Sequence, residues 1–479
     1  MRTVHALGVL AALGSIIGAA GVGCGSATPR PSIDDPNAFD AGEGSESGPG
    51  FGGGGDAGVA CVGLQCKQKV CAGGGDTTVT GTVYAPNGTL PLYNAIVYVP
   101  NATPDALTKG ASCDKCGAVT GAPVVTALTD ATGKFTLTNV PIGTDIPLVI
   151  QIGKWRRQVT IPEVKECTET AITDHDLTRL PKKQSEGDIP SIALTTGGCD
   201  LLGCMLPKVG IDPSEFGLDS DGPSKAVHVY NGNTNGSGAG GPGAANSARG
   251  LWNDPTKLKT YDLVVLSCEC EEAREGDPGS FDPSKGPAAF GAMTDYLTAG
   301  GRIFTTDFMY TWYRNSPDPG LSGATSMRGG APGGGSPISI DTTFPKGKAL
   351  GDWLATVTPG SNDKVTPDVV FGNIISTDPM KSQQWATSGT PNAGPRVFSV
   401  NVPVGLPADQ QCGKGVHIDA HLNNGGGLGG SGSDKIDSSY PAGCASSLKE
   451  GEKLLAFFFF DLASCIQNET DMPKPPQVK

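Results

Sequence analysis

The chain has 479 residues, enough for about two to four domains of ordinary size. It carries 35 Lys and Arg against 48 Asp and Glu, a formal net charge of −13, which disfavours nucleic acid and anionic lipid headgroups as electrostatic partners. The 71 Gly and 38 Pro residues gather in particular segments, so the rest of the chain keeps apolar runs that are long enough to build sizeable cores.

The amino terminus has the features of an export signal. Residues 6–20 are apolar but too few to span a bilayer, and small residues follow as far as Cys24. The tract Gly21-Val22-Gly23-Cys24 resembles a bacterial lipobox, although Leu is usual where Gly21 stands. That resemblance implies a signal peptide over 1–23 and a lipidated Cys24, and Gly25 implies the outer membrane. Ordinary cleavage, giving a secreted or periplasmic protein, is the alternative.

Residues 24–75 are predicted to be a disordered tether. This segment is rich in Gly, Ser and Asp, and it cannot bury enough apolar surface to offset its loss of chain entropy. It would hold a folded body away from the lipid surface. No later run of 18 or more apolar residues follows, so no membrane span is expected beyond the signal.

Fourteen Cys in a chain with an export signal point to an oxidising compartment and to disulfides. Without Cys24 thirteen remain, so at least one thiol is free or bonds another molecule. Cys61, Cys66 and Cys71 are expected to form a small knot. Cys113 and Cys116 are expected to close a loop with a disulfide, because a metal site would need a second such pair.

Residues 76–178 have the pattern of a small β-sandwich, with short alternating strands separated by turns. The predicted strands are 78–85, 95–99, 124–129, 135–141 and 148–152. The pattern Thr129-Asp130-x-x-Gly133-x-Phe135, with Val79-x-Gly81-x-Val83 and Asn94-Ala95-x-Val97 before it, resembles a carboxypeptidase regulatory-like domain of the transthyretin-like type. This resemblance implies a surface or adhesion module without catalysis. Trp155, followed by two arginines, is expected to cap the sandwich, with sugar stacking as the alternative.

Residues 188–467 alternate strands with helices, which predicts an α/β domain with a mostly parallel sheet; residues 468–479 form a tail. Asp200 is expected to cap a short helix, and long loops are expected near 231–249, 315–336 and 423–434. The predicted strands are 191–195, 226–230, 263–266, 303–306, 397–400 and 415–418, and the predicted helices include 287–297 and 448–465.

Three stretches of this domain, 261–266, 300–304 and 413–417, resemble the class I glutamine amidotransferase-like fold, with trehalose-utilisation (ThuA-like) proteins as the nearer type. Active amidotransferases carry a Gly-x-Cys-x-Gly nucleophile elbow and a downstream His/Glu pair. Neither occurs here in that form, so the resemblance implies the fold more than the activity.

Candidate site residues follow the predicted strands, because open α/β sheets bind ligands at the carboxyl ends of their strands. A thiolate at Cys268 or Cys270 would need His421 as its base and Asp307 or Glu269 to orient it. The alternative is that both cysteines are structural. Gly197, Gly198, Tyr310 and Trp312 fall at the same edge and are expected to bind a ligand.

No metal ion or cofactor is expected. His417 and His421 would lie about 13 Å apart on one strand, too far to share an ion, and nothing selects a partner for Asp419. The run 219–222 lacks the final Glu of an EF-hand loop, and the Gly-rich run 236–241 lacks the Lys-Ser/Thr of a phosphate loop.

The predicted protein is therefore a cell-envelope lipoprotein whose folded body binds or scaffolds a glycan or peptide. A thiol hydrolase that uses Cys268 or Cys270 with His421 is the competing prediction, and a ThuA-like function linked to carbohydrate is a third.

Overall fold

The structure, a computed structural model, describes residues 61–113, 119–232, 245–277, 284–330, 332–424, 434–463 and 466–478. The predicted signal peptide, most of the tether and the lipidation residue Cys24 lie outside these ranges, as do Cys116, Cys465 and the Gly-rich run 236–241. Residues Cys61–Lys479 make up one unit by their internal contacts.

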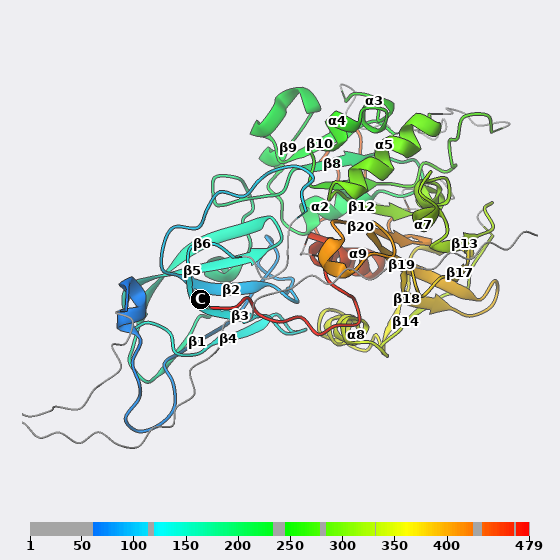
Figure 1. The fold of residues 1–479 in the computed structure, drawn as a ribbon. Helices are drawn as coiled ribbons and strands as arrows, with labels where there is room; N and C mark the ends of the chain where they lie inside the picture. Colours follow the sequence, from blue (N-terminus) through cyan, green and yellow to red (C-terminus); the bar gives the residue numbers. More distant parts are fainter. Residues whose placement is uncertain are drawn as a thin grey trace, which may run out of the picture. The chain divides into compact units, whose positions relative to one another are not determined.

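Two small sheets form the β-sandwich, drawn in blue and cyan in Figure 1. One sheet has the order β4-β1-β7 and the other the order β3-β2-β5-β6. Alternate apolar side chains of both sheets, such as Val79, Val97 and Ile150, are fully buried between them. Two further strands, β6 and β7, complete the set that the sequence predicted. The bounds are β1 Thr78–Thr82, β2 Ile96–Pro100, β3 Pro123–Leu128, β4 Lys134–Leu137, β5 Gly143–Ile152, β6 Trp155–Val164 and β7 Glu169–Ala171, followed by the one-turn helix α1 His175–Thr178.

The rest of the chain is built on one ten-stranded mixed sheet of order β15-β14-β18-β19-β20-β12-β11-β8-β10-β9. The strands from β9 to β20 along this order pair in parallel. The strands from β20 to β15 pair antiparallel. The sheet, which was expected to be mostly parallel, is therefore parallel only from β9 to β20. The bounds are β8 Ile192–Thr195, β9 Phe216–Gly217, β10 Val227–Tyr230, β11 Leu263–Leu266, β12 Arg302–Thr306, β14 Ile338–Ile340, β15 Lys364–Val365, β18 Gln383–Ser388, β19 Gly394–Val402 and β20 Gly413–Ile418.

The central parallel strands are buried along their whole length, as parallel strands covered on both faces must be. Apart from the two-residue edge strand β9, the parallel strands β8, β10, β11, β12 and β20, numbered in chain order, take the spatial order 2-1-3-4-5, which reverses direction between β8 and β11. Sheets of this order bind ligands beyond the carboxyl ends of their strands, beside the reversal.

Helices cover this sheet, and two of the longer ones begin at a proline, which suits the first turn because that turn leaves its N–H groups unbonded. No helix in the described ranges is both long and apolar enough to cross a membrane. The helices are α2 Met205–Lys208, α3 Arg249–Trp252, α4 Pro255–Leu258, α5 Pro287–Thr298, α6 Thr311–Arg314, α7 Pro319–Ser322, α8 Pro345–Val357 and α9 Glu450–Ala463. Two short pairs, β13 Thr325–Met327 with β17 Ile374–Thr377 and β16 Val369–Val370 with β21 Ala420–His421, lie outside the large sheet.

Asp200 does not cap a helix as predicted. Its carboxylate accepts hydrogen bonds from the backbone N–H groups of Leu422 (3.1 Å) and Asn423 (2.8 Å), far along the chain. The helical segment that follows begins only at Leu202 and has no side-chain cap. Asp200 therefore fastens the end of β21 to the end of β8.

The sandwich and the large sheet share one apolar core. Trp155 is fully buried and its ring packs against Phe459 and Phe460 of α9, with ring centres 6.4 and 6.0 Å away. Trp155 is therefore a packing residue and is not available to stack on a sugar. In the opposite direction, Trp353 of α8 contacts the sandwich and donates its indole N–H to the carbonyl of Pro91 at 2.8 Å.

Five disulfides are seen among the described cysteines, and Cys268 is free. Cys113 pairs with the distant Cys412, so the predicted loop-closing Cys113–Cys116 disulfide is wrong. The expected knot is only partly local, because Cys71 bonds Cys167. The remaining pairs are Cys61–Cys66, Cys199–Cys270 and Cys204–Cys444.

A buried ion pair also joins the two layers. Lys154, between β5 and β6, donates to Asp262 at 2.6 Å and to the carbonyl of Gly110 at 2.6 Å. Asp262 precedes β11 and accepts the backbone N–H of Ser191 at 2.7 Å. Because both charges are almost fully enclosed, removal of either one leaves the other without compensation.

We expect Lys154→Ala to lower the free energy of unfolding by about 3–5 kcal/mol, because it leaves the buried Asp262 carboxylate without its cationic partner. Urea unfolding of the disulfide-intact protein measures this change. Lys348→Ala is the matched control: it breaks an exposed pair with Asp352 on α8 and should cost less than about 1 kcal/mol. Equal losses in the two variants would contradict the role assigned to Lys154.

Candidate functional site

Three strand ends bring together one sulfur, one carboxylate and one imidazole. Cys268 follows β11, Asp307 follows β12 and His421 ends β21, just beyond β20. Oδ2 of Asp307 lies 3.3 Å from Sγ of Cys268 and 3.0 Å from Nε2 of His421. One donor atom from each residue lies within 4.8 Å of the other two, and all three side chains are buried. The predicted association of Cys268, His421 and Asp307 is therefore present in the structure.

The Asp307 backbone is held in an unusual conformation, with a φ of 41°. Residues with a side chain seldom adopt this left-handed region, and such strain persists only where the surroundings enforce it. Here the side chain of Asn373 donates to Oδ1 of Asp307 at 3.0 Å. The bend turns the chain from β12 into a 3₁₀ segment and aims Oδ2 at Cys268 and His421.

A second carboxylate, that of Asp419, helps to hold Asn373 in place beside Asp307. Asp419 accepts hydrogen bonds from the side chain of Asn373 at 2.9 Å and from the backbone N–H groups of Asn373 (2.8 Å) and Ile374 (3.2 Å). The fully buried Arg396 guanidinium lies 3.8 Å from the same carboxylate. Asn373 thus links two carboxylates and fixes the orientation of both.

Burial and charge act on each titratable group here. Burial raises the pKa of the Cys268 thiol well above its usual value, and the Asp307 carboxylate raises it further. Burial lowers the pKa of His421, but the hydrogen bond and attraction to Asp307 outweigh this and leave it raised. Burial, together with repulsion from Asp307, raises the pKa of Asp419 to about 7, and burial raises the pKa of Asp200.

The order of these groups does not match a nucleophilic triad. In such a triad the imidazole lies between the nucleophile and the carboxylate, so that it can take the proton. Here the carboxylate of Asp307 contacts both the sulfur and the imidazole, and it repels a thiolate. A convergent sulfur, oxygen and nitrogen set is, however, a donor set that can hold a transition metal ion.

Two neighbours of Cys268 cannot take the roles predicted for them. Cys270 is bonded to Cys199, so it has no thiol to act as a nucleophile. Glu269 is fully buried and pairs with Lys285, whose ammonium lies 5.1 Å from the ring centre of Trp252. Glu269 is thus engaged in a buried ion pair with Lys285.

The predicted ligand-binding residues are packing residues in the structure. Gly197 is buried so tightly that a Cβ atom there would lie 2.1 Å from the carbonyl oxygen of Cys268, and Gly198 is also buried. Tyr310 is fully buried and donates to Glu272 at 2.8 Å. Trp312 packs against Trp252 and Phe290. None of the four offers an exposed surface to a ligand.

His417 and the run 219–222 also have structural roles. His417 is enclosed by aromatic rings, including Tyr313 and Phe398, and burial lowers its pKa to about 3. Asp219 bonds Lys257 at 3.0 Å and Asn246 at 2.6 Å, so protein groups use its oxygens.

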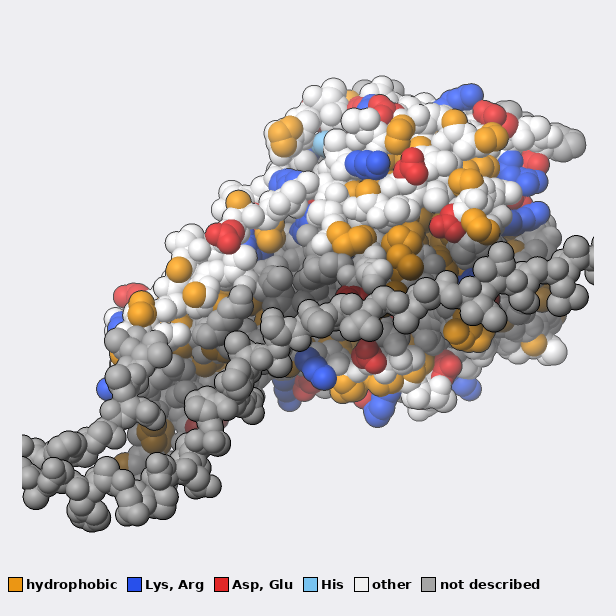
Figure 2. Space-filling model, in the orientation of Figure 1, with side chains coloured by type: hydrophobic (Ala, Val, Ile, Leu, Met, Phe, Trp, Pro, Cys, Tyr) orange, Lys and Arg blue, Asp and Glu red, His pale blue; other side chains and the backbone are white. Residues whose placement is uncertain are grey.

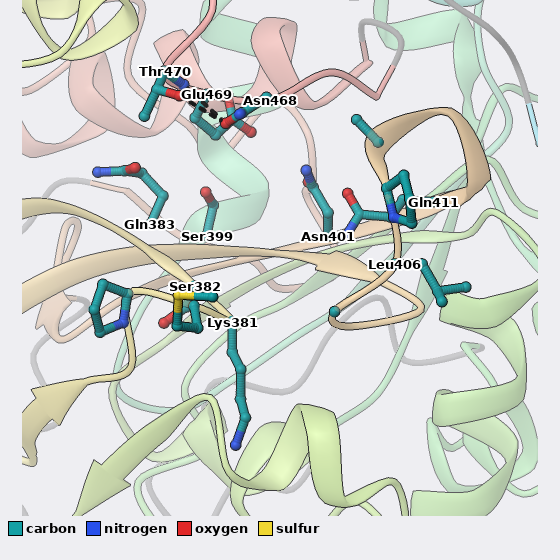
Figure 3. Close-up of a pocket in the computed structure, with 15 residues that line it drawn as sticks. Lys381, Ser382, Gln383, Ser399, Asn401, Leu406, Gln411, Asn468, Glu469 and Thr470 are labelled. Carbon is teal, nitrogen blue, oxygen red and sulfur yellow. Dashed lines mark hydrogen bonds between the residues drawn. The ribbon is translucent and has the colours of Figure 1, made fainter.

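A polar groove of about 430 Å³, which no sequence pattern indicated, lies between the antiparallel strands and the carboxyl-terminal segment. Figure 3 shows Gln383 of β18 and Ser399 and Asn401 of β19 pointing across the groove toward Asn468 and Thr470, with Gln411 at one end. The groove depends on residues 467–470 folding back over the sheet, where Asn401 donates to the carbonyl of Gln467 at 3.2 Å.

The fold and site define a mixed α/β protein with a fused β-sandwich, a buried Cys/Asp/His cluster and a separate polar groove. Neither the models of known families nor the curated proteins contain a match to this chain. Among solved structures, two interface mutants of a type II cohesin–X-dockerin complex from Acetivibrio cellulolyticus are similar over a part of the chain. The first is 14% identical with a TM-score of 0.15 and covers 30% of this chain and 75% of that chain. The second is 15% identical with a TM-score of 0.14 and covers 31% and 79%.

We expect Cys268 to resist alkylation in the native protein. Each unit by which its pKa is raised lowers the thiolate fraction about tenfold, and burial limits access as well. Iodoacetamide at neutral pH, followed by peptide mass spectrometry, should show Cys268 modified at least about tenfold more slowly than in the same non-reduced protein in urea. Native alkylation as fast as in urea would identify a reactive thiol instead.

Proposed function

We propose that this chain is a lipid-anchored cell-envelope protein that binds a glycan in the polar groove and does not catalyse a reaction. The observation that carries the proposal is the chemistry of the groove. Seven of the fifteen residues that line it have uncharged amide or hydroxyl side chains, which both donate and accept hydrogen bonds. Sugar hydroxyl groups do the same, so the two surfaces are complementary.

Charge in the groove is largely neutralised by neighbouring groups. Glu469 belongs to the carboxyl-terminal segment that faces the strands across the groove (Figure 3), is 4% exposed, and pairs with Lys346 at 2.7 Å and with Lys414. Lys381 points away from the groove (Figure 3) and lies 3.4 Å from Asp378. On the face of the molecule shown in Figure 2, acidic and basic side chains are interspersed. These features favour a neutral ligand over a charged one.

Asn401 and two apolar side chains mark the borders of the groove. Oδ1 of Asn401 is buried and has no hydrogen-bond partner among the described residues, although an unpaired buried acceptor costs about 1–3 kcal/mol. At the mouth of the groove, Met380 and Leu406 are exposed and offer apolar contact to the carbon face of a sugar ring.

A peptide ligand is less well supported by the same groove. Peptides that add to a sheet need a strand edge with free backbone groups. Both strands beneath the groove are already paired on each side, β18 with β14 and β19, and β19 with β18 and β20. Recognition here must therefore come from side chains, which suits a ligand that presents hydroxyl groups.

The competing proposal is a thiol hydrolase, and the convergence of Cys268, Asp307 and His421 supports it. It would require an imidazole next to a thiolate and access for a substrate. The raised pKa of Cys268, its burial and the carboxylate beside it all oppose that requirement. Binding is therefore the better supported function.

We expect the double variant Asn401→Ala with Gln411→Ala to weaken glycan binding about tenfold, because two hydrogen bonds of about 0.5–1.5 kcal/mol each are lost. A glycan array followed by calorimetry on the best binder measures this. Gln158→Ala, an exposed amide on β6, is the matched control and should not change the affinity. Binding of peptides in place of glycans, or glycan binding unchanged in the double variant, would contradict the proposal.

We also expect Cys24→Ser to release the protein from membranes. A lipobox cysteine carries the acyl chains that anchor a lipoprotein, and stable anchoring needs more than one chain. Fractionation of expressing cells should place the wild type with membranes and the variant in the soluble fraction. Cys61→Ser, which alters a disulfide but not the anchor, should stay with the membranes. A wild type found only in the soluble fraction would favour ordinary secretion.

A further inference from the structure

We propose that Cys268, Asp307 and His421 together bind one divalent transition-metal ion, with Zn²⁺ as the ion they suit best. The site is distinct from the polar groove, and the inference does not rest on the proposed glycan binding. Sulfur, imidazole nitrogen and carboxylate oxygen are the three ligand types that Zn²⁺ takes in proteins. A hard ion such as Mg²⁺ or Ca²⁺ would take oxygen ligands only.

The distances between the donor atoms suit one ion. Tetrahedral Zn²⁺ with bonds of about 2.0–2.3 Å places its ligand atoms about 3.3–3.8 Å from one another. Here the sulfur lies 3.3 Å and the imidazole nitrogen 3.0 Å from the same carboxylate oxygen. All three atoms fall within 4.8 Å of one another, so small rotations of buried side chains would complete the geometry. Three protein ligands leave the fourth tetrahedral position for water or a small anion.

The buried carboxylates around these atoms favour binding of a cation. Three carboxylates, Asp200, Asp307 and Asp419, are fully or almost fully buried in this part of the molecule. Arg396 lies 3.8 Å from Asp419. Asp200 accepts backbone N–H groups, with no lysine or arginine seen beside it in the described ranges. Buried negative charge is costly unless it is paired or coordinates a metal, and a divalent ion would supply that compensation.

Two polar contacts point to a bound thiolate and a bound imidazole. The backbone N–H of Cys270 donates to Sγ of Cys268 at 3.4 Å, as backbone groups do toward metal-bound thiolates. The imidazole of His421 faces the same atoms through Nε2, the nitrogen that lies 3.0 Å from Oδ2 of Asp307.

The support behind the three residues is of the kind that metal sites require. Outer groups that hold the ligands typically affect metal affinity 10- to 100-fold. Asn373 fills this role, since its side chain bonds both Asp307 and Asp419. The Cys199–Cys270 disulfide fixes the backbone two residues after Cys268 to the end of β8. The site is thus held by elements that are themselves fixed.

Titration of the non-reduced mature chain with Co²⁺, an optical substitute for Zn²⁺, tests the proposal. We expect one equivalent to bind, with visible bands of tetrahedral intensity and a thiolate-to-cobalt charge-transfer band, and one equivalent of Zn²⁺ to displace it. Cys268 is the free thiol of the described residues, so this band reports on it.

Cys268→Ser should abolish the charge-transfer band, and His421→Gln should weaken binding more than about 100-fold. Asn373→Ala should weaken it about 10- to 100-fold without changing the shape of the spectrum. His175→Gln, at an exposed histidine of the sandwich, is the control and should bind as the wild type does. Near-UV circular dichroism first establishes that each variant is folded. If a variant is not folded, the wild-type spectrum decides.

Absence of stoichiometric Co²⁺ and Zn²⁺ binding by the wild type would overturn the proposal. So would a spectrum without a thiolate band, or binding that is equally strong in folded Cys268→Ser and His421→Gln variants.

Discussion

The arrangement of the site depends on where the Asp307 carboxylate is held. Its backbone adopts a left-handed conformation at the end of β12, and Asn373 fixes its outer oxygen. The inner oxygen therefore stands between the sulfur of Cys268 and the imidazole of His421. This placement works against a nucleophile, since a carboxylate opposes formation of a thiolate unless a cation joins them. The same placement assembles three donor atoms of different types around one point.

Much of the strand pattern could be predicted from the sequence, because buried strands are short apolar runs between turns. The predicted strand at 263–266 is β11, and the predicted helix at 287–297 covers nearly all of α5. The antiparallel strands of the sheet could be predicted less well from the sequence. Gln383 of β18 lines the groove, and β18 also carries Gln384, Thr387 and Ser388, so it lacks the apolar run of a core strand. Sheet order and direction depend on contacts distant in sequence, which no local pattern encodes.

The candidate site, like the fold, could be predicted from the sequence only in part. The rule that ligands lie at the carboxyl ends of parallel strands correctly brought Cys268, Asp307 and His421 together from three separate segments. It could not say which cysteine keeps its thiol, because the partner of Cys270 is 71 residues away in the sequence. It also could not separate buried aromatic residues from exposed ones, as Tyr310 and Trp312 show. Asn373 carried no signal at all, since its role exists only once two carboxylates meet.

The most direct test of this account is X-ray absorption at the zinc edge on the mature protein with one equivalent of Zn²⁺. The account predicts one sulfur at about 2.3 Å and nitrogen or oxygen ligands at about 2.0–2.2 Å. Cys268→Ser should remove the sulfur contribution while the disulfides remain intact. A first shell of nitrogen and oxygen alone in the wild type would place the ion elsewhere, and would leave Cys268 as an ordinary buried thiol.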